Sequence, residues 1–138
     1  RWLESEEAPN WVPLSKPLSE SKLGLICTGG IYVTGQTAFH FKDDTTYRAI
    51  PTDVDTSELR ATHFAYDLTD ARKDINVVFP IEQLRTMINE NSLGSLASNA
   101  YTLMGGIYST RRVIEELIPA LVDRVLADEV DVVLLVPV

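Results

Sequence analysis

The sequence predicts an α/β fold in which a largely parallel β-sheet is flanked by helices. Two apolar runs, residues 22–28 and 132–136, do not alternate with polar residues, which is typical of strands buried on both faces. Residues 110–128 carry apolar side chains every 3.6 residues and indicate an amphipathic helix. A helix leading into a buried strand is half of a βαβ unit, and right-handed crossover would make that strand parallel to its neighbour. We therefore expect a sheet of the Rossmann or flavodoxin type.

The predicted domain occupies residues 22–138 and follows an extended N-terminal arm, residues 1–21. The arm contains both Trp residues and three of the seven Pro, and we expect Trp2 and Trp11 to anchor it on a surface. The last predicted strand has no covering helix after it. We therefore expect the sheet to be incomplete at the C-terminus and the domain to continue beyond residue 138.

Between the first strand and the later helices lies a long polar insertion, residues 31–74. Its length indicates either a functional loop or elements that periodicity does not reveal. Short strands are expected at residues 31–33 and 62–66. The sequence also predicts a strand at residues 76–79.

Two helices are expected after that strand. Residues 80–91 begin with Pro80 and place Ile81, Leu84 and Ile88 on one face. The second helix, residues 110–128, contains Pro119. An interior proline removes a hydrogen bond, so the helix should kink or break there.

Composition argues against several classes of partner. The chain has 12 Lys and Arg against 20 Asp and Glu, a net charge of −8, and no basic cluster that would bind nucleic acid or an anionic membrane. No apolar run approaches the length of a membrane span. A single cysteine, Cys27, fits a reducing compartment, and we expect a cytoplasmic protein.

Seven stretches of the chain, in order and at matching spacing, resemble one family. They include LICTGG (25–30), YRAIPTD (47–53), THFAYD (62–67), DINVVFP (74–80) and VLLVPV (133–138), together with residues 11–22 and 94–97. This pattern is similar to that of the glycine/sarcosine/betaine reductase selenoprotein B family, which is related to the selenoprotein subunit of D-proline reductase.

The resemblance implies part of a thiol- or selenol-dependent reductase that acts on a small, carboxylated, nitrogen-containing substrate. It implies a redox cysteine or selenocysteine directly after Val138, so no residue of this chain is the expected nucleophile and no cofactor is expected within it. A thioredoxin-like electron donor, other reductase subunits or further copies of the chain, and a pyruvoyl group on a partner subunit are the implied partners. The alternative is a non-catalytic α/β binding or assembly module completed by a partner chain.

At the end of the first strand, Thr28, Gly29 and Gly30 form a turn whose backbone N–H groups could meet a substrate carboxylate, or which could be an ordinary tight turn. Cys27, just before them, is either an accessory thiol or a small buried apolar residue. Its neighbours in sequence offer no cation that would lower its pKa.

The densest polar group surrounds the THFAYD motif. His63 and Asp67 could orient one another as a general base and its partner, or belong to a solvated loop. Arg48 could clamp a carboxylate with its planar guanidinium or pair with a nearby Asp, and Asn76 could contact substrate or support the loop. The chain has too few converging ligands for a metal site, and we expect none.

Overall fold

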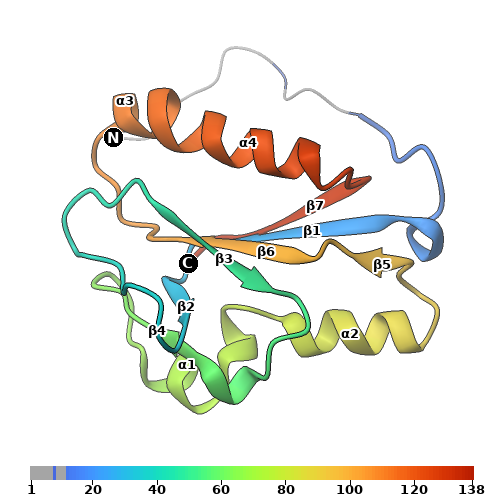
Figure 1. Ribbon diagram of the computed structural model, residues 1–138, viewed down its shortest axis with the longest axis horizontal. Coiled ribbons are helices and arrows are strands. Elements are labelled where there is room, and N and C mark those ends of the chain that lie inside the picture. The colour runs from blue at the N-terminus through green and yellow to red at the C-terminus, as the bar shows by residue number, and fades with distance from the viewer. Residues whose placement is uncertain (1–7, 9–11) are drawn as a thin grey trace.

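The computed structural model describes residue 8 and residues 12–138, and one β-sheet with helices on both faces forms its centre (Figure 1). Strand β1 (Lys22–Cys27) lies in the middle of the sheet. Strand β7 (Val132–Val136) runs parallel along one edge of β1, from Leu23↔Val132 to Cys27↔Val136. The predicted final strand and its parallel direction are therefore confirmed.

The other edge of β1 is shared by two short strands. Strands β5 (Ser95–Leu96) and β6 (Asn99–Leu103) both pair parallel with β1. Strand β3 (Tyr47–Pro51) is antiparallel to β6 and completes the sheet on that side. The fold class predicted from the sequence, a mostly parallel α/β sheet, is confirmed.

Short and long helices cover the two faces unequally (Figure 1). We call the face packed by α1 (Thr69–Lys73), the 3-10 turn η3 (Ile75–Val77) and α2 (Ile81–Asn89) the closed face. The face packed by α4 (Ile118–Ala127) is the open face. Successive side chains of β1 point to opposite faces of the sheet. Leu23, Leu25 and Cys27 therefore join the closed-face core, whereas Ile26 packs against the core of the open face.

The closed-face core holds most of the buried apolar side chains. Its members are less than a tenth exposed and include Ile31, Ile50, Leu59, Val78, Phe79, Ile81, Leu84, Leu93 and Ala100. The predicted helix at 80–91 is confirmed as α2, with Ile81 and Leu84 buried and Ile88 packed against this core.

The predicted strand at residues 76–79 is wrong. The Asp74 side chain accepts hydrogen bonds from the Asn76 N–H and from its amide, and these close the turn η3 instead. A local side-chain-to-backbone bond of this kind competes with strand pairing, and apolar content alone does not reveal it.

The long helix predicted at 110–128 is present, and a π-helical turn lies directly before Pro119, where a kink or break was predicted. It begins as α3 (Thr110–Arg112), continues through a π-helical turn η4 (Val113–Leu117) and ends as α4. Pro119 lies in the first turn of α4, directly after the π-helical turn, where its missing N–H is accommodated.

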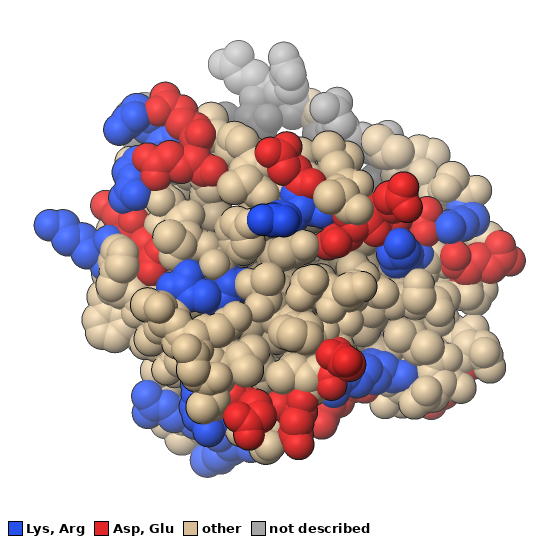
Figure 2. Space-filling model, in the orientation of Figure 1, with Lys and Arg blue, Asp and Glu red and all other residues tan. Residues whose placement is uncertain are grey.

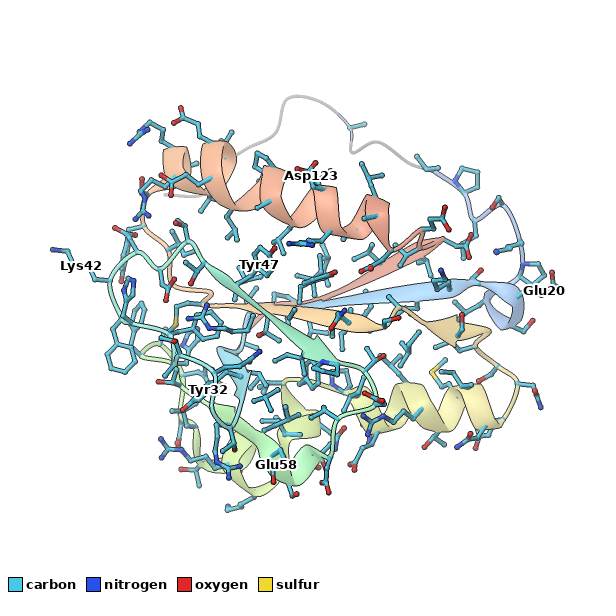
Figure 3. All side chains as sticks on the ribbon, viewed as in Figure 1. Glu20, Tyr32, Lys42, Tyr47, Glu58 and Asp123 are labelled. Atoms are coloured by element: carbon cyan, nitrogen blue, oxygen red, sulfur yellow. The ribbon has the colours of Figure 1, made fainter. Side chains whose placement is uncertain are left out.

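Two polar contacts hold this helix on the sheet. The Arg124 Nε donates to the Tyr47 hydroxyl at 2.9 Å, and the Tyr101 hydroxyl donates to the Asp128 carboxylate at 2.7 Å. Figure 3 shows Tyr47 between the sheet and α4. Burial, followed by the hydrogen bond to Asp128, raises the pKa of Tyr101 to about 12, so this phenol stays a donor.

Strand β7 is not buried on both faces, contrary to the prediction. Leu134 is 36% exposed and Leu135 65% exposed. Within the described residues β7 pairs only with β1, so its far edge has no strand beside it. A run of apolar residues indicates a strand whose faces must be covered, but it does not indicate which polypeptide covers them.

The 31–74 segment contains elements that periodicity did not reveal. Strand β2 (Ile31–Val33) is confirmed and pairs antiparallel with β4 (Leu59–Ala61), which follows the 3-10 turn η2 (Thr56–Glu58). The predicted strand at 62–66 is wrong, because pairing with β2 ends at Ala61 and residues 62–66 leave the small sheet.

The described end of the N-terminal arm, residues 12–21, contains the 3-10 turn η1 (Leu18–Glu20). Lys16 forms an ion pair with Asp131 at 2.7 Å. Trp2 and Trp11 lie outside the described residues. On the face shown in Figure 2, acidic and basic side chains are interspersed.

Candidate functional site

Three strands end at one edge of the sheet, and their loops meet at Thr28. Because β1, β6 and β7 are parallel, their carboxyl ends share this edge, where open α/β sheets bind ligands. The Thr28 N–H donates to Val136 O at 3.0 Å, and Thr28 O accepts from the Gly105 N–H at 3.0 Å. The Thr28 hydroxyl oxygen accepts from the Val138 N–H at 2.8 Å. One residue thus connects the ends of all three strands.

The glycine turn after Thr28 allows a very close backbone approach. Gly30 has φ +68°, and a Cβ at this position would lie 1.9 Å from Thr62 O. The Gly30 carbonyl accepts from the Thr62 N–H at 3.0 Å. Glycine is therefore required here, since it brings the 62–67 loop against the end of β1.

The turn offers fewer free N–H groups than a typical anion-binding loop. The Thr28 and Gly30 N–H groups already donate to Val136 O and Leu103 O. The Gly29 carbonyl is also used, because it accepts from the Tyr66 hydroxyl at 3.0 Å. The turn is consequently better suited to fixing the geometry of this edge than to holding an anion with several backbone groups.

His63 lies beside this turn with one nitrogen lacking a partner. His63 is only 5% exposed, and its Nδ1 accepts from the Ala65 N–H at 3.0 Å. That bond places the imidazole proton on Nε2, which is buried and has no hydrogen-bond partner. Its adjacent ring atom, Cδ2, would lie 3.7 Å from a Cβ at Gly30. Burial lowers the pKa of His63, so the ring is neutral and Nε2 is a donor.

Aromatic side chains surround His63 and continue to the surface. Its ring is 4.7 Å from that of Tyr66 and stacks on Phe64 at 5.6 Å, centroid to centroid. Phe64 in turn lies 6.1 Å from Phe41 and 6.4 Å from Tyr108. Phe41, Phe64 and Tyr108 are 59%, 38% and 82% exposed, and we call them the aromatic cluster.

Phe64 closes the site over His63 by lying on Gly106. A Cβ at Gly106 would be 2.1 Å from the Phe64 ring, so only glycine permits this contact. The sequence offered no periodic signal for Phe41, Phe64, Gly106 or Tyr108. Their only advance indication was that Phe64 stands inside the THFAYD motif.

The other predicted site residues do not gather with His63. Asp67 is exposed and caps α1, accepting from the Thr69 N–H and hydroxyl at 2.9 and 2.6 Å. These two bonds, the hydroxyl first, lower the pKa of Asp67. Because His63 Nε2 has no partner, the expected mutual orientation of His63 and Asp67 is wrong.

Arg48 and Asn76 hold loops. The Arg48 guanidinium donates to Thr37 O at 2.6 Å and lies 4.2 Å above the Phe39 ring. The Asn76 amide donates to Glu82 at 2.6 Å and its oxygen accepts the Glu82 N–H at 3.0 Å, which caps the start of α2.

A separate polar hollow of about 530 Å³ lies between β4, α1 and η3. Arg60, Arg72 and Lys73 line one part of it, and Asp74, Asn76 and Glu82 another. Asn76 therefore faces this hollow and not the edge where the strands end.

Cys27 is fully buried in the closed-face core, and burial raises the pKa of its thiol to about 12. Both properties favour the interpretation as a small apolar residue over that of a reactive thiol. Within the described part of the chain, no three His, Cys, Asp or Glu side chains converge as metal ligands. No helix there is long and apolar enough to cross a membrane.

Comparison with known proteins adds a family match. The model of the glycine/sarcosine/betaine reductase selenoprotein B family matches residues 6–138. D-proline reductase subunit gamma of Acetoanaerobium sticklandii is 32% identical over 127 residues, which are 92% of this chain and 52% of that protein. The chain thus spans about half the length of this relative. No solved structure gives a significant match.

Proposed function

Because this chain belongs to the glycine/sarcosine/betaine reductase selenoprotein B family, we propose that it is part of a thiol- or selenol-dependent reductase acting on a small, carboxylated, nitrogen-containing substrate. Reductive cleavage of a carbon–nitrogen bond takes up two electrons and two protons. A thioredoxin-like dithiol that becomes a disulfide supplies both. The pyruvoyl group implied by the resemblance would belong to a partner subunit, and no step proposed here passes through it.

One observation carries the proposal: a buried histidine with an unpartnered Nε2–H lies beside the turn where three parallel strands end. The Val138 N–H donates to the Thr28 hydroxyl oxygen, which holds Val138 beside the end of β1. This contact supports a nucleophile at the same end of the sheet. A cysteine or selenocysteine directly after Val138 would follow a residue that is bonded to Thr28, and would therefore lie near the glycine turn. We place the reacting sulfur or selenium there.

In this proposal His63 acts as a hydrogen-bond donor to an anion at the edge of the sheet. A neutral imidazole with its proton fixed on Nε2 by the Ala65 N–H can donate to a thiolate, a selenolate or a substrate carboxylate. The Phe64 ring stacks on the imidazole and His63 is only 5% exposed, so side chains around the imidazole must move to admit the anion. Gly106 gives the ring its resting place and Gly30 keeps the backbone of the 62–67 loop close.

Substitution of His63 in the intact, reconstituted reductase tests the proposal. We expect His63→Phe to lower kcat/KM by about 10- to 100-fold, the range for losing one hydrogen bond to a charged group. His63→Gln, which retains an N–H donor, should lose less. The matched control is His40→Gln, because His40 has a 67% exposed side chain and lies outside the site. A folded His63→Phe enzyme with unchanged kcat/KM would reject the role of His63.

The alternative, a non-catalytic assembly module, is favoured by the apolar far edge of β7, which suits a partner chain better than a substrate. Reductase subunits that turn over substrate at an unchanged rate without this chain would support that function instead.

A further inference from the structure

An apolar surface lies on the open face of the described molecule. Four aliphatic side chains of the long helix are spaced four residues apart, and each is at least 46% exposed: Ile114, Ile118, Val122 and Leu126. Leu135 of β7, 65% exposed, faces the same groove. The groove has a volume of about 600 Å³ and is lined almost entirely by aliphatic residues.

The edge of β7 beside this groove has unused backbone groups. Val136 O accepts from the Thr28 N–H, and the backbone groups of a strand point alternately to its two sides. Val133 and Leu135 therefore direct their N–H and C=O groups away from β1. Within residues 12–138 no other strand pairs with them. An unpaired edge next to an apolar groove is a template for another strand.

The topology indicates which elements would fit. The chain passes from β1 to β6 with α2 on the closed face, and from β6 back across β1 to β7 with α4 on the opposite face (Figure 1). A further right-handed step in the same direction would place its helix on the open face beside α4, and its strand parallel to β7. Exposed aliphatic side chains spaced four residues apart form a ridge on the helix surface. A ridge of this kind packs into a groove on a neighbouring helix.

From this geometry we infer that the groove and the edge of β7 bind one helix–strand unit, an amphipathic helix against Ile118, Val122 and Leu126 followed by a strand parallel to β7. The occupant is the polypeptide that corresponds to the half of D-proline reductase subunit gamma outside the matched region. That relative is about twice as long as the part matched here, and so has enough chain for such a unit. The inference does not depend on the redox chemistry proposed above.

Hydrogen exchange in the intact protein tests the strand. We expect the Val133 and Leu135 amides to exchange at least about 1,000-fold more slowly than an unpaired amide. The Leu134 amide, which points to β1, is the internal reference for a paired strand. Val133 and Leu135 amides that exchange as fast as unpaired ones would overturn the inference, because the edge would then be open to water.

A photo-crosslinker tests the helix and identifies the occupant. In the intact protein, p-benzoylphenylalanine replaces Val122, or Val77 as the control, which is 60% exposed on the other side of the sheet. We expect the Val122 probe to capture an apolar helical peptide corresponding to the second half of the relative, and the Val77 probe to capture none. Such a peptide supports the inference whether it is joined to this chain or is a separate subunit. Capture of residues 1–138 of another copy, or of nothing, overturns it.

Discussion

The two faces of the central sheet are built from similar amounts of helix but differ in how completely they are covered. On the closed face, Phe79 and Ile81 have no exposed surface and Leu84 is 5% exposed. On the open face, Leu117 and Leu121 are 2% and 8% exposed, yet Leu126 is 69% exposed. The sheet therefore buries only part of the apolar stripe of α4. Hydrophobic periodicity therefore indicates the surface that must be covered, but it does not indicate what covers it.

The largest expected effect on the free energy of unfolding comes from a mutation on the closed face, and a mutation on the open face serves as the comparison. Phe79→Ala removes a fully buried ring from the closed face and should lower the free energy of unfolding by about 3–5 kcal/mol. Leu126→Ala on the open face should cost about 2 kcal/mol, because the inferred helix covers this side chain in the intact protein. Urea denaturation of the intact protein measures both. A cost for Leu126→Ala below about 0.5 kcal/mol would mean that the face is exposed to water.

The next effect concerns the backbone contact that brings the 62–67 loop against the sheet. Gly30→Ala should cost about 2–3 kcal/mol, because it combines a positive φ with a Cβ that would overlap Thr62 O. Gly35→Ala is the control: φ is +94° but no atom lies within 4 Å of a Cβ there. Its cost should be near 1 kcal/mol. Equal costs for the two variants in thermal unfolding would show that the close contact does not matter.

A smaller effect should appear in the dependence of stability on pH. Burial lowers the pKa of His63 from its ordinary value of 6.5. In the unfolded chain His63 takes up a proton below that value, whereas the folded protein resists it. The contribution is therefore complete above pH 6.5 and is lost as the pH falls through the lowered pKa, by at most about 1.4 kcal/mol per pH unit. Urea midpoints at pH 7.5 and 5.5 should differ less in His63→Gln than in the native protein. The same difference between the two midpoints in both proteins would mean that His63 does not cause this pH dependence.

The smallest effect is expected at the only cysteine. Because Cys27 is fully buried and its thiol has a pKa of about 12, iodoacetamide at pH 8 should leave it unmodified in the folded protein. Mass spectrometry measures the extent of alkylation, with the urea-unfolded protein as the positive control. Cys27 should therefore cause no loss of redox activity when the folded protein is treated with iodoacetamide. Loss of turnover when Cys27 alone is modified and the fold is intact would assign it a direct role.

The candidate site was only partly predictable. The strand ending at Cys27 and the glycines after it were evident, since an apolar run followed by Gly29 and Gly30 is a local pattern. The position of His63 was not, because it depends on a contact between Gly30 and Thr62. Asp67 and Asn76 attracted attention as polar residues in a motif, yet both cap helices or turns, a local function that residue type alone does not separate from catalysis.

Sequence patterns alone predicted the order of most of the main elements, the parallel direction of β7, and a change in the long helix near Pro119. The element order and the change in the helix follow from periodicity and proline chemistry, which act over a few residues, whereas the direction of β7 follows from the right-handed crossover rule. The packing of the folded chain decided that β3 joins the main sheet, that Phe64 rests on Gly106 beside His63, and that within the described residues the far edge of β7 has no strand beside it. Each of these depends on contacts between residues far apart in the chain, and those contacts are set by how whole faces pack together.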